Sequence, residues 1–171
     1  MRVGFLIVAA AALLSFQVVA KEKAAGELLI GAWKLESWVI TDSTGETRYP
    51  MTEKPQGRII YTEGGQMSAQ LMHPDPSLPN LAGLSDHEIM GRVQGKFISY
   101  YGAWSVDEAA QTVTHHVAGS NVPSVIGTDQ ARSLEFKGQD QLRLVARLRE
   151  GVVDEDVGIT GTNVPVWSRI K

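Results

Sequence analysis

The sequence predicts an all-β protein made of a single antiparallel β-barrel, and three observations lead to this fold class. Short segments in which apolar and polar residues alternate are separated by turn residues along most of the chain, as is typical of β-strands. No alternation of strands and helices is visible, so a parallel sheet is not expected. Gly31-Ala32-Trp33 opens the first strand and Arg169 lies on the last, a pairing that favours a barrel over a sandwich.

The two ends of the chain are expected to lock this barrel. Gly31 would let the backbone pass close beneath one barrel end, where the indole of Trp33 plugs the floor. The Arg169 guanidinium would then lie over the indole as a cation–π pair, worth about 0.5–2 kcal/mol. These three residues are therefore assigned to barrel closure, which is a structural role.

Composition narrows the classes of function. The chain has 171 residues, a formal net charge of −3 and no cysteine. The near balance of charges gives no electrostatic reason to expect nucleic acid or an anionic membrane as a partner. Without cysteine the chain has no disulfide, no thiolate metal site and no cysteine nucleophile.

Residues 1–20 are predicted to be a signal peptide. Arg2 supplies a positive charge, an apolar run follows, and small residues end at Ala20 before a polar stretch. A membrane anchor is the alternative, but the run reaches the lower limit for a spanning helix only if Gln17 is included. Cleavage would give an exported protein, periplasmic or secreted, without stable membrane insertion. Residues 21–28 would form a linker and a helical turn, and residues 29–171 the barrel domain.

A helical turn and a long strand are expected to begin the domain. Residues 27–30 predict the turn, whose leucines would cover one end of the barrel. Residues 33–40 alternate with a period of two, which indicates a half-buried strand. A turn at 42–45 and a short strand at 46–49 follow.

The clearest local pattern is a hairpin. Residues 57–62 and 66–72 are rich in strand-forming residues and flank the pair Gly64-Gly65. Because glycine readily adopts the positive φ values that tight turns require, this segment predicts two antiparallel strands joined by a short turn.

Residues 74–94 form the one stretch that interrupts the strand pattern. Three prolines occur in its first part, and Ser85 and Glu88 stand in the relation of a helix-capping box. We expect a short helical insertion here, and a lid over the barrel mouth is a natural role for it.

The second half of the domain returns to strands separated by turns. With the earlier segments these make eight or nine short strands, as expected for an up-and-down barrel. Their ranges are 96–106, 112–120, 128–137, 141–149 and 164–170.

Seven stretches, spread over nearly the whole barrel domain, share a pattern with known proteins. They are Gly31-Ala32-Trp33-Lys34-Leu35, Gly57-Arg58-Ile59-Ile60-Tyr61-Thr62, Met67-Ser68-Ala69-Gln70-Leu71-Met72, Tyr101-Gly102, Thr112-Val113-Thr114-His115-His116-Val117, Gly127-Thr128 and Val166-Trp167-Ser168-Arg169. In this order along the chain, they resemble the bacterial lipocalin-like domain proteins. The resemblance implies a lipocalin-like barrel, and such barrels mostly carry small apolar molecules, while a minority act as isomerases or cyclases. The resemblance implies no catalytic residue.

His115 and His116 are the most conspicuous chemical groups. Adjacent strand residues point to opposite faces, so one histidine faces the lumen and the two cannot chelate one metal. A metal would need ligands from other strands, so neither metal nor cofactor is expected. An inward histidine close to Tyr100 or Tyr101 could act with the phenol as general base and acid. The alternative is that these groups only anchor a bound ligand.

The strand 67–72 offers two candidate inner faces. Met67, Ala69 and Leu71 make one, and the set that contains Gln70 and Met72 makes the other. The pattern leaves both orientations open, and we prefer the second set as the lumen lining because it can form hydrogen bonds.

Arg132 shares a strand face with Gln130. Facing inward, it could hold a ligand carboxylate, whereas a rim arginine paired with an exposed acid is the alternative. The predicted ligand-lining residues are Tyr61, Gln70, Met72, Tyr101, Trp104, His116 and Arg132.

The function that follows is binding of a small, mostly apolar molecule in the lumen of an exported barrel. The alternatives are an isomerase or cyclase that uses a lumen histidine and tyrosine, and a structural envelope protein without a ligand. Nucleophilic catalysis is not expected, because no Gly-x-Ser-x-Gly motif occurs and neither Ser120 nor Ser124 has an identifiable activating partner. No phosphate-binding glycine loop occurs either.

Overall fold

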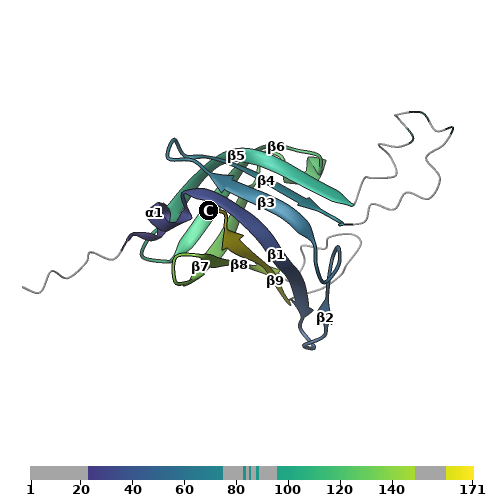
Figure 1. Ribbon diagram of the computed structural model, residues 1–171, viewed down its shortest axis with the longest axis horizontal. Helices are drawn as coiled ribbons and strands as arrows, with labels where there is room; N and C mark the ends of the chain where they lie inside the picture. The colour runs from purple at the N-terminus through teal and green to yellow at the C-terminus, as the bar shows by residue number, and fades with distance from the viewer. Residues whose placement is uncertain (1–22, 75–82, 84, 86–87, 89–95, 149–160) are drawn as a thin grey trace, which may run out of the picture.

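The computed structural model describes residues 23–74, 83, 85, 88, 96–148 and 161–171 (Figure 1). These residues form one antiparallel sheet of nine strands, and a pairing between β1 and β9 closes it into a barrel. The predicted all-β barrel is confirmed. The signal peptide predicted at 1–20 and most of the lid predicted at 74–94 lie outside the described residues.

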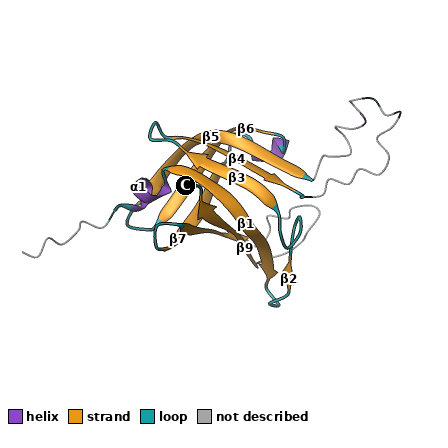
Figure 2. Cartoon of the chain, in the orientation of Figure 1, coloured by secondary structure: helices purple, strands orange, loops and turns teal. Residues whose placement is uncertain are grey.

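Strands follow one another around the barrel in chain order, except that the short strand β2 pairs only with the outer part of β1 (Figure 2). The strand expectations from the sequence match these elements closely. The described elements are α1 (Ala25–Leu29), β1 (Gly31–Asp42), β2 (Thr47–Arg48), β3 (Gln56–Tyr61), β4 (Gln66–Met72), β5 (Phe97–Asp107), β6 (Thr112–Ser120), the 3₁₀ turn η1 (Pro123–Val125), β7 (Asp129–Lys137), β8 (Gln141–Leu148) and β9 (Gly161–Arg169).

Strands β3 and β4 form the predicted hairpin. Its pairing runs from Gln56 opposite Met72 to Tyr61 opposite Met67. Gly65 in the turn has a φ of +74°, a value that few residues other than glycine adopt easily. The glycine pair therefore sets the turn, and the turn sets which residues of the two strands share a face.

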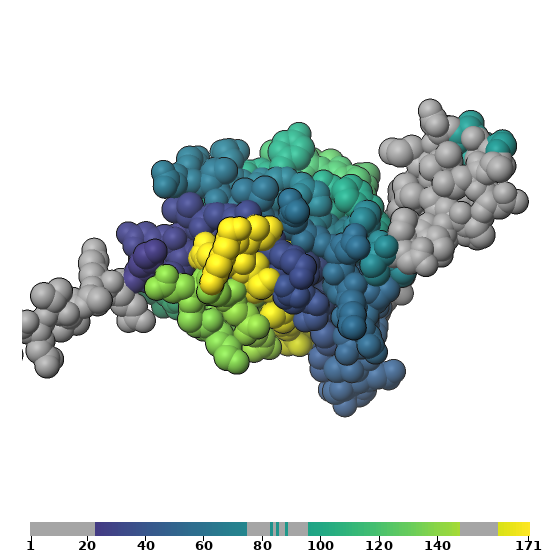
Figure 3. Space-filling model, viewed as in Figure 1, coloured from purple at the N-terminus to yellow at the C-terminus, as the bar shows by residue number. Residues whose placement is uncertain are grey.

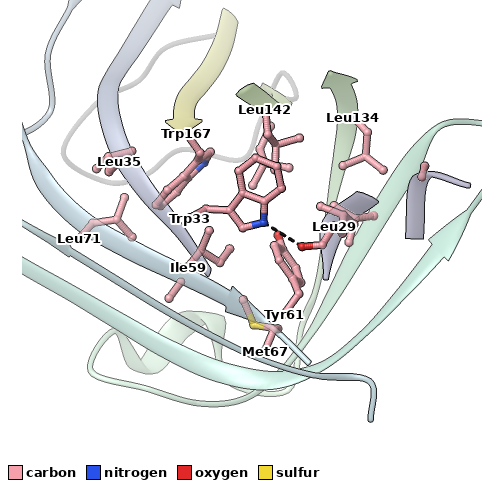
Figure 4. Close-up of a cluster of buried hydrophobic side chains, with 14 of the residues drawn as sticks. Leu29, Trp33, Leu35, Ile59, Tyr61, Met67, Leu71, Leu134, Leu142 and Trp167 are labelled. Carbon is pink, nitrogen blue, oxygen red and sulfur yellow. Dashed lines mark hydrogen bonds between the residues drawn. The ribbon is translucent and has the colours of Figure 1, made fainter. Parts of the chain in front are cut away.

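Helix α1 covers one end of the barrel. Leu29 is fully buried, and its carbonyl oxygen accepts a hydrogen bond of 2.8 Å from Trp33 Nε1 (Figure 4). At the other end of the helix, the Glu108 carboxylate accepts hydrogen bonds of 2.8 and 2.9 Å from the amides of Ala25 and Gly26. These bonds satisfy two of the amide groups that a helix start leaves unpaired, so α1 is fastened to β1 and to the turn after β5.

The first and last strands meet beside this helix, and β9 (yellow) lies between β1 and β8 (Figure 3). Trp33 is the register partner of Arg169, whose guanidinium carbon lies 4.1 Å from the centroid of the indole. The guanidinium also donates to the carbonyl oxygens of Leu28, Ile30 and Gln139. Gly31, with a φ of +125°, leaves the space that this side chain occupies, since a Cβ there would lie 3.0 Å from Arg169 Nη1.

A continuous apolar core fills the interior next to α1. Trp33 lies at its centre, with Trp167 on one side and Leu29 on the other (Figure 4). Each large side chain that becomes fully buried stabilises the fold by about 1.5–3 kcal/mol relative to an exposed one. The labelled members are Leu29, Trp33, Leu35, Ile59, Tyr61, Met67, Leu71, Leu134, Leu142 and Trp167.

Candidate functional site

Three strands bring one histidine and two tyrosines together inside the barrel. Tyr61 ends β3, Tyr100 lies in β5 and His115 lies in β6. Tyr61 Oη is 2.8 Å from His115 Nε2, and Tyr100 Oη is 3.2 Å from His115 Nδ1. His115 is completely shielded from solvent. Both nitrogens of a buried imidazole therefore have a phenol as hydrogen-bond partner.

Strand register and aromatic packing hold this cluster in place. Trp104 in β5 is the register partner of His115 in β6. Its ring packs edge-on against that of Tyr61, with centroids 5.4 Å apart and an interplanar angle of 75°. Such edge-to-face pairs are favourable beyond the area they bury. Because every member lies on a paired strand, the polar groups have little freedom to move apart.

Burial keeps all three rings of the cluster uncharged. Desolvation lowers the pKa of His115 from 6.5 to about 3, and electrostatic interactions with Arg132 and His116 add to the shift. Burial also raises the pKa of Tyr61 and Tyr100. At neutral pH the imidazole therefore carries one N–H and each phenol keeps its O–H.

This proton count gives the hydrogen bonds a direction. A neutral imidazole donates from one nitrogen and accepts at the other. Tyr61 is 1 % exposed, and His115 is its one hydrogen-bond partner in the described part of the chain, so its hydroxyl donates to Nε2. The network thus assigns the proton of His115 to Nδ1, which donates to the Tyr100 oxygen. The O–H of Tyr100 is left to donate to a further group.

Arg132 adds a positive charge to the same interior. It lies on the same face of β7 as buried Leu134. Its guanidinium donates to Ala131 O at 2.8 Å and to Gln130 Oε1 at 3.2 Å. Gln130 is the register partner of His115, so the guanidinium reaches toward the level of the cluster. No ion pair joins Arg132 to an acid among the described residues. Three of its five N–H groups remain for another partner.

A third donor lies in the apolar core. Trp167, on β9, is 2 % exposed, and its Nε1 has no hydrogen-bond partner among the described residues. A buried polar group without a partner costs about 1–3 kcal/mol. Together with Tyr100 and Arg132, this indole makes the interior richer in hydrogen-bond donors than in acceptors.

Strand β4 turns the opposite face inward from the one that we preferred from the sequence. Met67, Ala69 and Leu71 are buried in the core, so Gln70 and Met72 lie on the outer face. The prediction was wrong because it chose the set of residues that can form hydrogen bonds over the apolar set. The barrel interior next to β4 is apolar, and burial of the apolar set fixes the strand's orientation.

Two more predicted lining residues also lie outside. Tyr101 is 59 % exposed, because its neighbour Tyr100 takes the inner position. The side chain of His116 is 41 % exposed, and His115 is the histidine that faces the interior. Adjacent strand residues point to opposite faces, so the inward residue in each case is the one just before the predicted residue, Tyr100 for Tyr101 and His115 for His116.

The remaining predicted residues Tyr61, Trp104 and Arg132 face the interior, where the structure brings them together around His115. The predicted lining omitted Tyr100, His115 and Trp167. Tyr100 lies four residues before Trp104 on the same strand and therefore on the same face, and this spacing could have indicated Tyr100 as a lining residue. No local pattern marks Trp167.

Other features of the described residues are separate from this cluster. A hollow of about 480 Å³ lies outside the α1 end, next to Glu27, Glu63 and Arg169. No group of three or more histidine, aspartate or glutamate residues in the described chain could hold a metal ion. Within the same residues, no helix has the length and apolar character needed to cross a membrane.

Comparison with known proteins gives a family and a fold. A family model described as a lipocalin-like domain matches residues 30–170. No curated protein matches the chain significantly. Among solved structures, a redesigned β-barrel is 15 % identical with a TM-score of 0.41, and the match covers 86 % of this chain and 96 % of that one. A biogenic amine-binding protein is 13 % identical with a TM-score of 0.38, covering 83 % of this chain and 64 % of that one.

Proposed function

Because the chain belongs to the lipocalin-like domain family, we propose that it binds a small molecule inside the barrel, largely apolar and with an oxygen acceptor at its inner end. The observation that carries this proposal is the surplus of hydrogen-bond donors inside the barrel, at Tyr100 and Arg132 near His115 and at Trp167 in the apolar core. Among the described residues, no acceptor is found for some of the O–H and N–H groups of Tyr100, Arg132 and Trp167. A ligand acceptor that reaches any of these groups removes the cost of burying that group without a partner.

The charge of Arg132 decides which acceptor fits best. A carboxylate can accept two parallel hydrogen bonds from a guanidinium, and bonds to charged groups are about twice as strong as neutral ones. The described interior places no acid beside Arg132, so a cationic ligand would meet uncompensated repulsion. The apolar part of the ligand would lie against Trp104 and the apolar side chains of the core.

A series of ligands that differ only in their head group tests this proposal. Calorimetric titration with dodecanoate, methyl dodecanoate, dodecanol and dodecylammonium keeps the alkyl chain constant. We expect dodecanoate to bind most tightly and the ammonium least. Arg132→Met should weaken dodecanoate binding about tenfold, the equivalent of about 1.4 kcal/mol, and should hardly change binding of the ester.

The matched control is Arg58→Met, which removes an exposed arginine from the outer face of β3. It should leave the whole series unchanged. Equal affinity for all four head groups would refute the acceptor-bearing ligand, and no binding of any of them would refute an apolar lumen ligand.

Acid–base catalysis on a carbonyl compound is the second candidate, and the hydrogen bonds of His115 to two phenols favour it. The lowered pKa of His115, about 3, makes it a weak base at neutral pH, which is why binding ranks first. Incorporation of deuterium from D₂O next to the carbonyl of a bound ketone, followed by NMR, would move catalysis to first place.

We also propose that binding takes place outside the cytoplasm. The support is the sequence of residues 1–20, with its charged start, apolar run and small residues before the polar stretch. Sequencing the N-terminus of the protein purified from its host should give Lys21 as the first residue. An intact Met1 would refute cleavage.

A further inference from the structure

We propose that the outer wall of the barrel carries a second site, at which Ser105 is a nucleophile activated by His116 and Asp129 and cleaves activated acyl esters. The site is independent of the lumen. His116 points away from the interior that His115 occupies, and the two serines weighed from the sequence, Ser120 and Ser124, have no part in it.

The three side chains form a continuous hydrogen-bonded line. Ser105 Oγ is 2.9 Å from His116 Nε2, and His116 Nδ1 is 2.7 Å from Asp129 Oδ1. A nucleophile within hydrogen-bond reach of a base, with the base oriented by a third group, is the arrangement that activates serine in hydrolases on unrelated folds. The carboxylate selects the imidazole tautomer with its proton on Nδ1, which leaves Nε2 free to accept the serine proton.

Strand register explains why residues distant in the sequence meet here. Ser105 lies on β5, His116 on β6 and Asp129 on β7, three neighbouring strands about 4.8 Å apart. Asp129 on β7 is the direct register partner of His116. On the other side of His116, its register partner on β5 is Ala103, and Ser105 lies two residues after Ala103 on the same face. All three point to the outer face, within the reach of diagonal cross-strand neighbours.

Solvent can reach the line from outside. Ser105 is exposed, and the side chains of His116 and Asp129 are 41 % and 68 % exposed. The small residue Ala103 lies directly opposite His116 on the neighbouring strand. The serine side chain is therefore open to an acyl group from the solvent side.

The reaction is an acyl transfer in two halves. Ser105 Oγ bonds to the ester carbonyl carbon while its proton moves to His116 Nε2; the bond to the leaving oxygen then breaks, and His116 returns the proton to it. In the second half, water gives a proton to His116 and bonds to the acyl carbon. The acyl–serine bond breaks, Ser105 regains the proton, and a carboxylic acid is released.

Exposure sets the class of substrate. A buried oxyanion hole supplies a large part of the rate in serine hydrolases, and loss of one of its donors costs about 10²–10³ in kcat. On the exposed outer face of the barrel, water molecules would stabilise the oxyanion less effectively than such donors do. We therefore expect esters with good leaving groups, such as aryl esters, to react, and amides to remain uncleaved.

Two measurements on the full chain test the site. Nitrophenolate release from p-nitrophenyl acetate gives the rate, and an alkyl fluorophosphonate followed by peptide mass spectrometry locates the nucleophile. We expect the adduct on Ser105. His116→Gln should slow both labelling and ester cleavage at least about tenfold, less than the roughly 10²–10⁴ that a positioned general base typically contributes, because the site is exposed. Asp129→Asn should slow both less.

Ser133→Ala is the matched control, since Ser133 is an exposed serine on β7, the strand that also carries Asp129. Labelling and ester cleavage should be unchanged in it, and thermal melts confirm that each variant is folded. Ester cleavage that persists in Ser105→Ala would show that a histidine acts directly on the ester, which overturns the proposal. Labelling of Ser105 at an undiminished rate in His116→Gln, or no labelling at all, would also overturn it.

Discussion

The guanidinium of Arg169 covers the indole of Trp33, with 4.1 Å between the guanidinium carbon and the ring centroid. The two residues are register partners on the strands that close the barrel. Arg169 also binds three carbonyl oxygens around α1, so one side chain ties together the helix, the first strand and the turn before β8. This contact concerns closure of the barrel and lies apart from the His115 cluster.

Trp33→Ala should therefore reduce stability more than ligand affinity. Trp33 is fully buried, and truncation of such a residue costs about 3–5 kcal/mol because it leaves a cavity in the core. Urea denaturation gives the change in unfolding free energy, and calorimetry with dodecanoate at a temperature where the variant is folded gives the affinity. A folded variant with near-normal stability and no binding would show that Trp33 belongs to the ligand site.

Gly102→Ala should disrupt the pairing of β5 with β6. A Cβ at Gly102 would lie 1.9 Å from the carbonyl oxygen of His116, so the two backbones would have to separate. We expect a loss of at least about 1–3 kcal/mol, the usual cost of overpacking. Gly64→Ala is the control, because the nearest atom to a Cβ there is 3.9 Å away. Equal stability of the two variants by chemical denaturation would contradict the close approach.

The strands could be predicted from sequence because each depends on a local pattern. The period of two around Trp33 and the Gly64-Gly65 turn each fix a segment without knowledge of the rest. The inner face of β4 could not be predicted, because both of its faces carry residues that fit a lumen. The choice depends on what the other strands bury against Met67.

The two polar sites depend on register across strands, which no local pattern records. Ser105, His116 and Asp129 come together because β5, β6 and β7 pair as they do. The register of β5 and β6 also shifts at a bulge between Tyr101 and Gly102, so counting alternate residues along one strand does not give its partners on the next.

Acid should destabilise the protein through His115. Its pKa is about 3 in the folded state and near 6.5 when unfolded, so the unfolded chain binds more protons between these values. Stability therefore falls as pH drops below 6.5. At about 1.36 kcal/mol per pKa unit, the loss from this group is at most about 3–4 kcal/mol at pH 4.

His115→Gln isolates this contribution, because glutamine keeps one acceptor and one donor for the two tyrosines and does not titrate. Denaturant unfolding at pH 7 and pH 4 should show a smaller loss in the variant than in the natural protein. An identical loss in both would mean that His115 is already protonated in the folded state or does not control the pH dependence.

Tyr61→Phe and Tyr100→Phe should differ in their effect on ligand binding, because the two hydroxyls have different roles in the assigned network. The hydroxyl of Tyr61 donates to His115 Nε2, and its removal leaves a buried acceptor unpaired. That costs about 1–3 kcal/mol of stability. Tyr100→Phe likewise leaves the buried His115 Nδ1–H without its acceptor, so it should cost a similar amount of stability. Because it also removes the O–H that the network leaves free to donate, it should in addition weaken binding of dodecanoate severalfold.

Chemical denaturation and calorimetry on the two variants distinguish these roles, and nitrogen chemical shifts of the imidazole report the tautomer directly. With its proton on Nδ1, His115 Nε2 should show the shift of an unprotonated nitrogen in the natural protein. Tyr61→Phe should shift the tautomer balance because Nε2 loses its donor. Proton on Nε2 in the natural protein would reverse the network, make the Tyr61 hydroxyl the free donor, and exchange the expected effects of the two variants.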